Sequence, residues 1–310
     1  MRLSRRTALV MGLSSAALLS LALTGCGGAA DAASDPAGAS ATCPGGKIRF
    51  GVEPFEDPAK LEPAYRAIAD ALGKELNCPV EVTVVDNYAA EVLAMKNGQM
   101  ELGQFGPLGY VFAKDKAGAE ALASFGTSDG KLSSYTGAIY VPLDSPIRSV
   151  EDLRGKSLGL SEPGSTSGDA LPRFALRQAG MADTDVKIEY AGGHPEALLA
   201  LKNGKVEAAE INSQQLASAT AEGIFDPGAY RKIWTSEPIP NDPITVAGSA
   251  SPEFKAAVKA ALTNLPADAV AQAAAFLDVE PAGQLIAVTE ADYQPLSDLA
   301  ASLGLSEKDV

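Results

Sequence analysis

The sequence predicts an α/β protein of two lobes, in which each lobe is a mostly parallel sheet covered by helices. The chain has 310 residues, which is long for a single domain. From Lys47 onward, short strand-like runs alternate with segments of helical spacing, an order typical of parallel sheets. Residues 92–102 and 198–208 also match each other, each reading as a helix, a Lys-Asn-Gly stop and a strand. Two lobes built alike would produce that match, although any two helix-to-strand turns would too.

The predicted elements follow in order along the chain. Strand-like runs of the first half lie at 47–53, 80–85, 102–105, 121–125 and 136–141. Helical spacing covers 60–76 and 88–97, and Gly98 stands where helices commonly stop. Strands of the second half are expected at 158–160, 186–190, 206–211 and 231–235. The remaining helices are expected at 168–179, 195–202, 214–221, 255–263, 268–276 and 293–303.

This rhythm suggests how the chain divides. We expect 47–140 together with 243–310 to form the first lobe and 141–242 the second, joined by a hinge of two strands. Ligands of open α/β sheets bind at the carboxyl ends of strands, where helix N-termini converge. The chemistry of the protein is therefore expected at those ends.

The N-terminus is typical of a targeting segment rather than of the fold. Residues 1–25 carry three arginines at the start and an apolar run that is too short for a membrane span. Leu23-Thr24-Gly25-Cys26 reads as a lipoprotein cleavage box. We expect a lipoprotein signal peptide and an exported protein anchored by lipid on Cys26 to the outer face of the cell membrane. A plain secretory signal is the alternative, and Ser4-Arg5-Arg6 leaves twin-arginine and general export both open.

Residues 26–46 read as a flexible tether, because Gly, Ala, Ser and Asp dominate and almost no large apolar residue occurs. Cys43 lies just before the first predicted strand and Cys78 just before the second. In an oxidising compartment such a pair is more often a disulfide than a metal site, and neighbouring parallel strands would bring the two starts together. Two buried free thiols are the alternative.

Composition and charge exclude several functions. Hydrophobic residues make up 46% and charged residues 21%, as in soluble globular proteins. The formal net charge of −14, with no basic cluster, argues against a nucleic-acid partner. One histidine with no cysteine nearby leaves too few ligands for a zinc-type metal site, and no cofactor is indicated.

The densest chemical signal is Glu162-Pro163-Gly164-Ser165-Thr166-Ser167-Gly168, between a strand and a helix. Glycines let the backbone approach a ligand, and free N–H groups at a helix start form an anion site without lysine or arginine. One hydroxyl would suffice for an ordinary helix cap, whereas three flanked by glycines exceed that need. The run is not a nucleophile elbow, since Thr166 stands at its centre. His194 follows Gly192-Gly193 at a similar turn, where it is either a structural residue or a ligand contact.

Six short stretches in sequence order resemble the periplasmic phosphate/phosphite/phosphonate-binding components of ABC importers. They are Pro54-Phe55-Glu56-Asp57-Pro58, Asn87-Tyr88-Ala89-Ala90, Phe105-Gly106-Pro107-Leu108-Gly109-Tyr110, Ser165-Thr166-Ser167-Gly168, Gly192-Gly193-His194 and Ile239-Pro240-Asn241-Asp242-Pro243. The resemblance implies a type II-like periplasmic-binding-protein fold whose lobes close over a small anion.

The resemblance also implies roles for particular residues. Tyr88 and Tyr110 resemble the two tyrosines that close over the oxyanion from the first lobe. Residues 165–167, namely Ser165, Thr166 and Ser167, resemble the hydroxyl and backbone donors of the second lobe. His194 resembles the imidazole donor and Asp242 the carboxylate near the hinge, with Tyr135 as a weaker candidate. A carboxylate beside an anion needs a proton between them, so Asp242 would select ligands with a P–OH or a neighbouring donor.

One departure from the family pattern concerns ligand choice. Family members that bind aminoalkyl phosphonates place a glutamate where Gln214 stands, and a neutral amide pairs poorly with a buried ammonium. Gln214 therefore argues against 2-aminoethylphosphonate, although Glu210 lies near enough in sequence to compensate. A second departure is Leu108-Gly109, where small or hydroxyl residues are usual.

The sequence thus predicts a monomeric solute-binding component of an ABC importer, not an enzyme, with an importer permease as its partner. Phosphite or a small alkylphosphonate is the favoured ligand. A binding subunit of an anion-sensing receptor would share these features. An exported enzyme on the same fold is the other alternative, but no nucleophile–base–orienter set or metal cluster is evident.

Overall fold

The computed structural model describes residues 40–306 of the chain. The expected signal peptide, the lipidation residue Cys26 and most of the expected tether lie outside the described residues, so those expectations stay predictions. Within residues 40–306, no helix combines the length and the apolar character needed to cross a bilayer.

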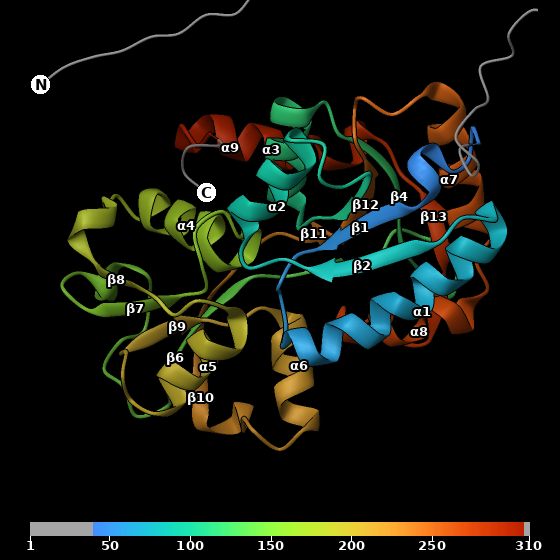
Figure 1. The fold of residues 1–310 in the computed structure, drawn as a ribbon. Coiled ribbons are helices and arrows are strands. Elements are labelled where there is room, and N and C mark those ends of the chain that lie inside the picture. The colour runs from blue at the N-terminus through green and yellow to red at the C-terminus, as the bar shows by residue number, and fades with distance from the viewer. Residues whose placement is uncertain (1–39, 307–310) are drawn as a thin grey trace, which may run out of the picture. The chain divides into compact units, whose positions relative to one another are not determined.

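A six-stranded sheet forms the larger half of the described chain (Figure 1). Its order is β13-β4-β12-β3-β1-β2. The strands are β1 (Ile48–Val52), β2 (Val80–Val84), β3 (Leu102–Gln104), β4 (Glu120–Thr127), β12 (Pro243–Val246) and β13 (Ala282–Ala287). The strand β1 pairs in parallel with β2 and β3, whereas β12 and β13 pair antiparallel with their neighbours.

Helices cover both faces of this sheet. Helices α1, α7 and α8 share one apolar core with it, and Figure 1 shows α1 beside α8. Helices α2, α3 and α9 share the second core, on the opposite face. Their bounds are α1 (Pro58–Leu76), α2 (Tyr88–Lys96), α3 (Pro107–Ala117), α7 (Pro252–Asn264), α8 (Ala267–Phe276) and α9 (Gln294–Leu303).

A five-stranded sheet of order β10-β6-β9-β7-β8 forms the second half. Its strands are β6 (Ala138–Pro142), β7 (Ser157–Leu160), β8 (Lys187–Tyr190), β9 (Ala208–Glu210) and β10 (Tyr230–Thr235). Helix α4 (Leu171–Gln178) covers one face, while α5 (His194–Lys202) and α6 (Ser213–Ala221) cover the other. In both sheets the strand next to one edge pairs in parallel with its two neighbours, β1 with β2 and β3, and β7 with β8 and β9.

Two short strands connect the two sheets. β5 (Ser134–Tyr135) leads from β4 to β6, and β11 (Ile239–Pro240) leads from β10 back to β12. They pair antiparallel with each other, as the hinge of the predicted fold requires. The predicted lobe boundary at residue 140 falls inside β6, which already belongs to the five-stranded sheet. The exact lobe boundaries stay a prediction.

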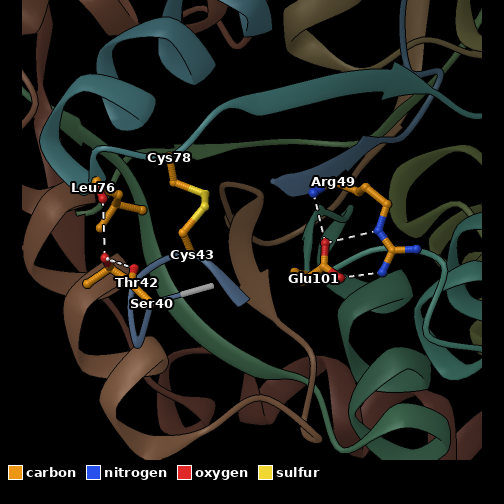
Figure 2. Close-up of a disulfide and its surroundings, with 7 residues drawn as sticks. All are labelled: Ser40, Thr42, Cys43, Arg49, Leu76, Cys78 and Glu101. Carbon is orange, nitrogen blue, oxygen red and sulfur yellow. Dashed lines mark hydrogen bonds and ion pairs between the residues drawn. A yellow bond between two sulfur atoms is a disulfide. The ribbon is translucent and has the colours of Figure 1, made fainter. Parts of the chain in front are cut away.

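A disulfide joins Cys43 to Cys78, as predicted, and its Cα atoms are 5.4 Å apart (Figure 2). The parallel pairing of β1 with β2 sets Ile48 beside Val80, which brings the two strand starts together. In the same region, Figure 2 shows the guanidinium of Arg49 on β1 against Glu101, whose carboxylate also accepts the Arg49 backbone N–H at 2.8 Å.

Three details differ from the sequence-based expectation, although the two-lobed α/β fold class is confirmed. Both sheets are mixed rather than mostly parallel, because the strands that return from the hinge run antiparallel to their neighbours. Helix α3 was not predicted: its first residues, Pro107-Leu108-Gly109, read as a turn, and the helix is buried on all sides near its start. Strands β12 and β13 were not predicted either: β12 is a four-residue run that starts at Pro243 directly after the hinge, and the sequence AGQLIA of β13 has weak strand propensity and depends on pairing with β4.

Candidate functional site

The turn after β7 places three hydroxyl residues at one buried point. A π-helix, Thr166–Ala170, runs directly into α4, and Ser165 caps it by accepting the N–H of Gly168 at 3.1 Å. Gly168 is the residue that closes this turn, because a Cβ there would lie 1.8 Å from Ser161 Oγ. The N–H groups of Thr166 and Ser167 find no acceptor among residues 40–306. They remain available as donors at the start of the helical segment.

His194 is the first residue of α5 and lies against the same turn. Its Nε2 is 3.2 Å from Ser165 Oγ, and its Nδ1 is 2.6 Å from Glu210 Oε1. Burial would lower the pKa of His194, but the charge of Glu210 and its hydrogen bond outweigh burial and raise that pKa above its ordinary value. Because Glu210 takes Nδ1–H, Nε2 can present a donor toward the hydroxyls when the ring is protonated.

Asn212, the N-cap of α6, completes this part of the site. Its Nδ2 donates to Ser167 Oγ at 3.3 Å and lies 3.4 Å from His194 Nδ1. Sequence reasoning had named Glu210 only as a possible partner of a ligand ammonium and had not named Asn212. The position of both at the end of β9 and the start of α6 is the signal that could have found them, since ligands gather at such ends.

Two tyrosines reach this turn from outside the five-stranded sheet. Tyr88 is the first residue of α2 and is fully buried. Burial and then the charges of Glu53 and nearby acids raise the pKa of its hydroxyl, whereas a hydrogen bond with Ser165 lowers it. Tyr135 on β5 behaves alike: burial and the charge of Asp242 raise its pKa, while hydrogen bonds with Ser167 and Thr166 oppose the shift. Both phenols therefore stay neutral hydrogen-bonding groups at the site.

Tyr110 lies elsewhere. Its ring meets that of Tyr293 edge to face at 5.2 Å between centroids. Burial raises the pKa of the Tyr110 hydroxyl, against a hydrogen bond with the backbone of Ala121 on β4. The structure thus does not bring Tyr110 together with the other candidate residues, because its side chain lies in the core between α3 and α9.

Asp242 lies just before β12 and is 5% exposed. Its Oδ2 accepts Nε2 of Gln104, the last residue of β3, at 2.6 Å. Burial raises the pKa of Asp242 to about 7, although the charge of His194 and the Gln104 hydrogen bond act in the opposite direction. The carboxyl therefore gains or loses its proton close to neutral pH.

Gln214 has its amide held by groups of the other half of the chain. Its Nε2 donates to Asn241 Oδ1 at 2.6 Å and to the carbonyl of Leu277 at 3.2 Å. Gln214 is thus bonded to the residue that precedes Asp242, and within residues 40–306 its amide nitrogen makes no hydrogen bond with the hydroxyl turn.

Contacts between the two halves close over this site. The hydroxyl of Thr166 accepts the N–H of Leu108, in the first turn of α3, at 2.9 Å. On the outer side, Lys60 on α1 pairs with Glu222 after α6 at 2.7 Å. Beside that ion pair, a groove of about 700 Å³ is lined by both halves, including Gly193 and Pro195 next to His194. A buried donor set thus lies between the two lobes, with the groove outside it. It consists of the hydroxyls of Ser165, Thr166, Ser167, Tyr88 and Tyr135 and the imidazole of His194.

No group of three metal-ligating side chains occurs within residues 40–306. The donors at the site are hydroxyls, an imidazole and backbone N–H groups, which suit an anion with several oxygens.

Relatives of known name match much of the chain. The phosphonates-binding periplasmic protein of Escherichia coli (strain K12) is 27% identical over 202 residues, which cover 64% of this chain and 60% of that protein. The match thus spans about three fifths of that relative's length. The phosphate-import protein PhnD of Mycolicibacterium smegmatis is 25% identical over 294 residues, covering 84% of this chain and 87% of that one.

A solved structure has the same fold. PhnD1 from Prochlorococcus marinus (MIT 9301), determined in complex with methylphosphonate, superposes with a TM-score of 0.72 over 86% of this chain and 99% of that chain, at 18% identity. The fold of this chain is thereby that of a two-lobed periplasmic binding protein.

The family model of periplasmic substrate-binding proteins of phosphonate ABC transporters matches residues 50–293. That range is most of the folded chain and includes both sheets, the hinge and every residue of the buried donor set. The chain therefore belongs to the family of phosphonate ABC-transporter periplasmic substrate-binding proteins.

Proposed function

We propose that this protein captures a small phosphorus oxyanion or phosphonate between its lobes and delivers it to the permease of an ABC importer. Phosphite or a small alkylphosphonate is the favoured ligand. The binding event is the whole activity, and lobe closure lets the permease distinguish loaded from empty protein.

The buried donor set is the observation that carries this proposal. The imidazole of His194 and the hydroxyls of Tyr88 and Tyr135 converge from three parts of the chain on the turn that holds Ser165. A tetrahedral phosphorus anion offers oxygens in several directions, and each hydrogen bond to a charged oxygen contributes about 1.5–3 kcal/mol. Several such bonds are enough for micromolar binding or better after the costs of association.

The surroundings of the donors favour a ligand without an ammonium group. Gln214 is neutral and its amide is bound to Asn241 and to a backbone carbonyl. Glu210, the carboxylate that might replace a glutamate at that position, has Oε1 bound to His194. Gln214 therefore offers no charge to an ammonium, and Glu210 has only Oε2 left to offer, which supports phosphite or methylphosphonate over 2-aminoethylphosphonate.

The lipid anchor and the monomeric state belong to this proposal as well. Lipidation at Cys26 would hold the protein at the outer face of the cell membrane, and a tether of about twenty residues would let it reach the permease. Mass spectrometry of the membrane-bound protein tests the anchor: a diacylglyceryl group on Cys26 supports it, and a mature chain that begins elsewhere contradicts it.

Ligand-dependent thermal stabilisation tests the function directly. The protein is unfolded and refolded to remove carried-over ligand, then heated with phosphite, methylphosphonate, 2-aminoethylphosphonate, phosphate or sulfate. A ligand at one hundred times its dissociation constant stabilises by about 2.7 kcal/mol, which shifts the melting temperature by a few degrees.

We expect phosphite or methylphosphonate to give the largest shift, and Ser167→Ala to reduce it. If 2-aminoethylphosphonate stabilised most, the argument from Gln214 would be wrong while anion capture survived. If no phosphorus anion stabilised the folded, ligand-free protein, the phosphorus assignment would have to be abandoned.

A further inference from the structure

Three carboxyl groups lie buried behind the donor set, on the side of the six-stranded sheet. They belong to Glu53 after β1, Glu91 on α2 and Asp242 before β12, and they are 1%, 0% and 5% exposed. None of the three forms an ion pair with a lysine or arginine among residues 40–306. The three carboxyls are buried, their charges act on one another, and none has a lysine or arginine partner, so most of this acid set must be protonated.

Glu91 is the most isolated member of the acid set. Neither of its carboxyl oxygens has a hydrogen-bond partner in the described chain. The sheet makes room for it with Gly51 and Gly103, which stand opposite each other on β1 and β3. A Cβ at either glycine would lie 3.1 Å from Glu91 Oε1. The group is thus built into the core as a neutral carboxylic acid.

Glu53 has one donor. Its Oε2 accepts the N–H of Gly106 at 2.5 Å, at the start of α3, while Oε1 has no partner within the described residues. Burial and then the charges of Glu91 and Asp242 raise the pKa of Glu53 well above its ordinary value. Burial followed by the charge of Asp242 does the same for Glu91.

Asp242 differs from the other two because the groups facing it stabilise its charge. Gln104 donates to its Oδ2 at 2.6 Å, and the charge of His194 attracts it. The remaining groups that act on it are Glu53, Glu91 and four neutral phenols, those of Tyr65, Tyr88, Tyr135 and Tyr293. Asp242 is therefore the member of the acid set that ionises first, close to neutral pH.

We propose that the protein, and not the ligand, supplies the proton between Asp242 and the bound anion. When the anion reaches the hydroxyl turn, the Asp242 carboxylate takes up one proton from solvent and then donates its O–H to an anion oxygen. The buried acids Glu53 and Glu91 keep their protons throughout. This inference rests on the proposed function and specifies its ligand class: singly charged anions bind whether or not they carry a P–OH group.

The physical reason is the balance of charge in the closed site. An anion held by Ser165 and His194 would face a second negative charge on Asp242 with little water to screen it. Protonating Asp242 costs little free energy near neutral pH, because the pKa of this carboxyl in the empty protein is about 7. Because binding consumes a proton, affinity should fall as the pH rises above about 7, by up to about tenfold per pH unit.

Hypophosphite separates the two possible sources of the proton. It is a monoanion with no P–OH group at any pH used, whereas methylphosphonate carries a titrating P–OH. We would titrate both into the stripped protein by calorimetry at about pH 8, where the empty Asp242 is mostly ionised, in two buffers that differ in ionisation enthalpy. The inference predicts uptake of about one proton when hypophosphite binds. It also predicts that uptake is lost in Asp242→Asn, with an affinity nearly independent of pH.

Glu91→Gln is the matched control in the same acid set. Since Glu91 is neutral in both states, this variant should keep the proton uptake of the wild type. Loss of uptake in Glu91→Gln would place the titrating charge on Glu91 and overturn the assignment to Asp242. The carbonyl stretch of a protonated carboxyl in the infrared difference spectrum gives a second readout on wild-type protein. It should appear on hypophosphite binding and be absent in Asp242→Asn, because Glu162, whose pKa burial also raises to about 7, would produce the same band, whereas an imidazole would not.

Three outcomes keep this inference apart from the proposed function. If methylphosphonate binds and hypophosphite does not, the ligand supplies the proton and the inference is overturned. If hypophosphite binds without proton uptake, the inference is overturned as well. If neither ligand binds to folded protein, the proposed function itself fails.

Discussion

The two sheets contribute opposite chemistry to the same buried site. The five-stranded sheet brings hydrogen-bond donors, namely the turn at Ser165–Gly168 and His194, to the ends of adjacent parallel strands. The six-stranded sheet brings carboxyl groups, Glu53, Glu91 and Asp242, to the corresponding place. The two halves have similar strand orders, so the difference lies in the side chains at the strand ends and not in the fold.

The comparison teaches how an acidic protein can hold an anion. Donors that come mostly from the second lobe provide the attraction locally, and the carboxyls of the first lobe are compatible with it only when they are largely neutral. Affinity is thus expected to depend on the donor turn, and the pH response on the acid set.

The largest effect is expected from breaking the donor turn. In Gly168→Ala, the new Cβ would lie 1.8 Å from Ser161 Oγ and 2.8 Å from the His194 ring, so the turn must shift. We expect loss of measurable ligand binding and destabilisation of about 2 kcal/mol or more. Gly204→Ala is the matched control, since that glycine has φ +65° but open space around it. It should cost about 1 kcal/mol from backbone strain and leave binding intact. Equal affinity in both variants, measured by calorimetry, would refute the role of the turn.

Removing the disulfide should change stability without changing the site. Cys43 and Cys78 lie 35 residues apart in sequence at the starts of β1 and β2, whereas the donors lie at strand ends. Closing a loop of that length constrains the unfolded chain, so replacing both cysteines by serine should cost about 3–4 kcal/mol of unfolding free energy. Chemical denaturation gives the cost, and ligand affinity at low denaturant should match the wild type. A comparable loss of affinity would mean that the first sheet is not an independent scaffold.

The acid set predicts how stability depends on pH. The pKa of Glu91 is raised in the folded state, so above its ordinary pKa the folded protein binds more protons than the unfolded chain does. Stability contributed by this group is therefore present at low pH and is lost as the pH rises above about 4.5. The loss is up to about 1.4 kcal/mol per pH unit for one proton.

Glu91→Gln keeps the shape and removes the titration, so its unfolding free energy should fall less steeply with pH. Denaturation curves from about pH 5 to about pH 8 measure both slopes. Identical slopes in the variant and the wild type would show that Glu91 is ionised in the fold.

The smallest effect is expected from the ion pair between the lobes. Lys60 and Glu222 pair at 2.7 Å but are 37% and 39% exposed, so water and salt screen their attraction. Lys60→Ala should speed ligand release by about two- to threefold at low salt and less at high salt. Lys47→Ala removes a comparable pair with Glu81 inside one sheet and should leave the release rate unchanged. Equal release rates in the two variants, measured by stopped flow, would argue against a role for Lys60 in closure.

The sequence was sufficient for the second-lobe half of the site because its signals are local. Each strand-to-helix junction is marked by a few neighbouring residues. These are the glycines and hydroxyls at Ser165–Gly168 and the Gly-Gly-His turn. The same holds for the disulfide, since Cys43 and Cys78 stand directly before strands that pair. The alternation of elements likewise gave the two-lobed fold.

The rest depended on contacts between distant segments. Helix α3 starts with a Pro-Leu-Gly run whose sequence is typical of a turn. The hydrogen bond from the Leu108 N–H to the Thr166 hydroxyl was therefore not predicted. Tyr110 was expected at the site by resemblance alone, and burial between α3 and α9 places it elsewhere. Glu53 and Glu91 gave no signal, because a buried neutral acid looks the same in sequence as a surface glutamate. The direction of the strands also could not be predicted from the sequence, because β12 and β6 follow crossings of the hinge that no local sequence pattern indicates.

The most direct test of the central claim compares two tyrosines. Calorimetric titration of methylphosphonate into wild-type protein, Tyr88→Phe and Tyr110→Phe separates a hydroxyl at the donor turn from one that lies in the core. The account predicts binding by the wild type, a loss of about tenfold or more in Tyr88→Phe, and little change in Tyr110→Phe. Absence of binding to the wild type, or an equal loss in both variants, would contradict it.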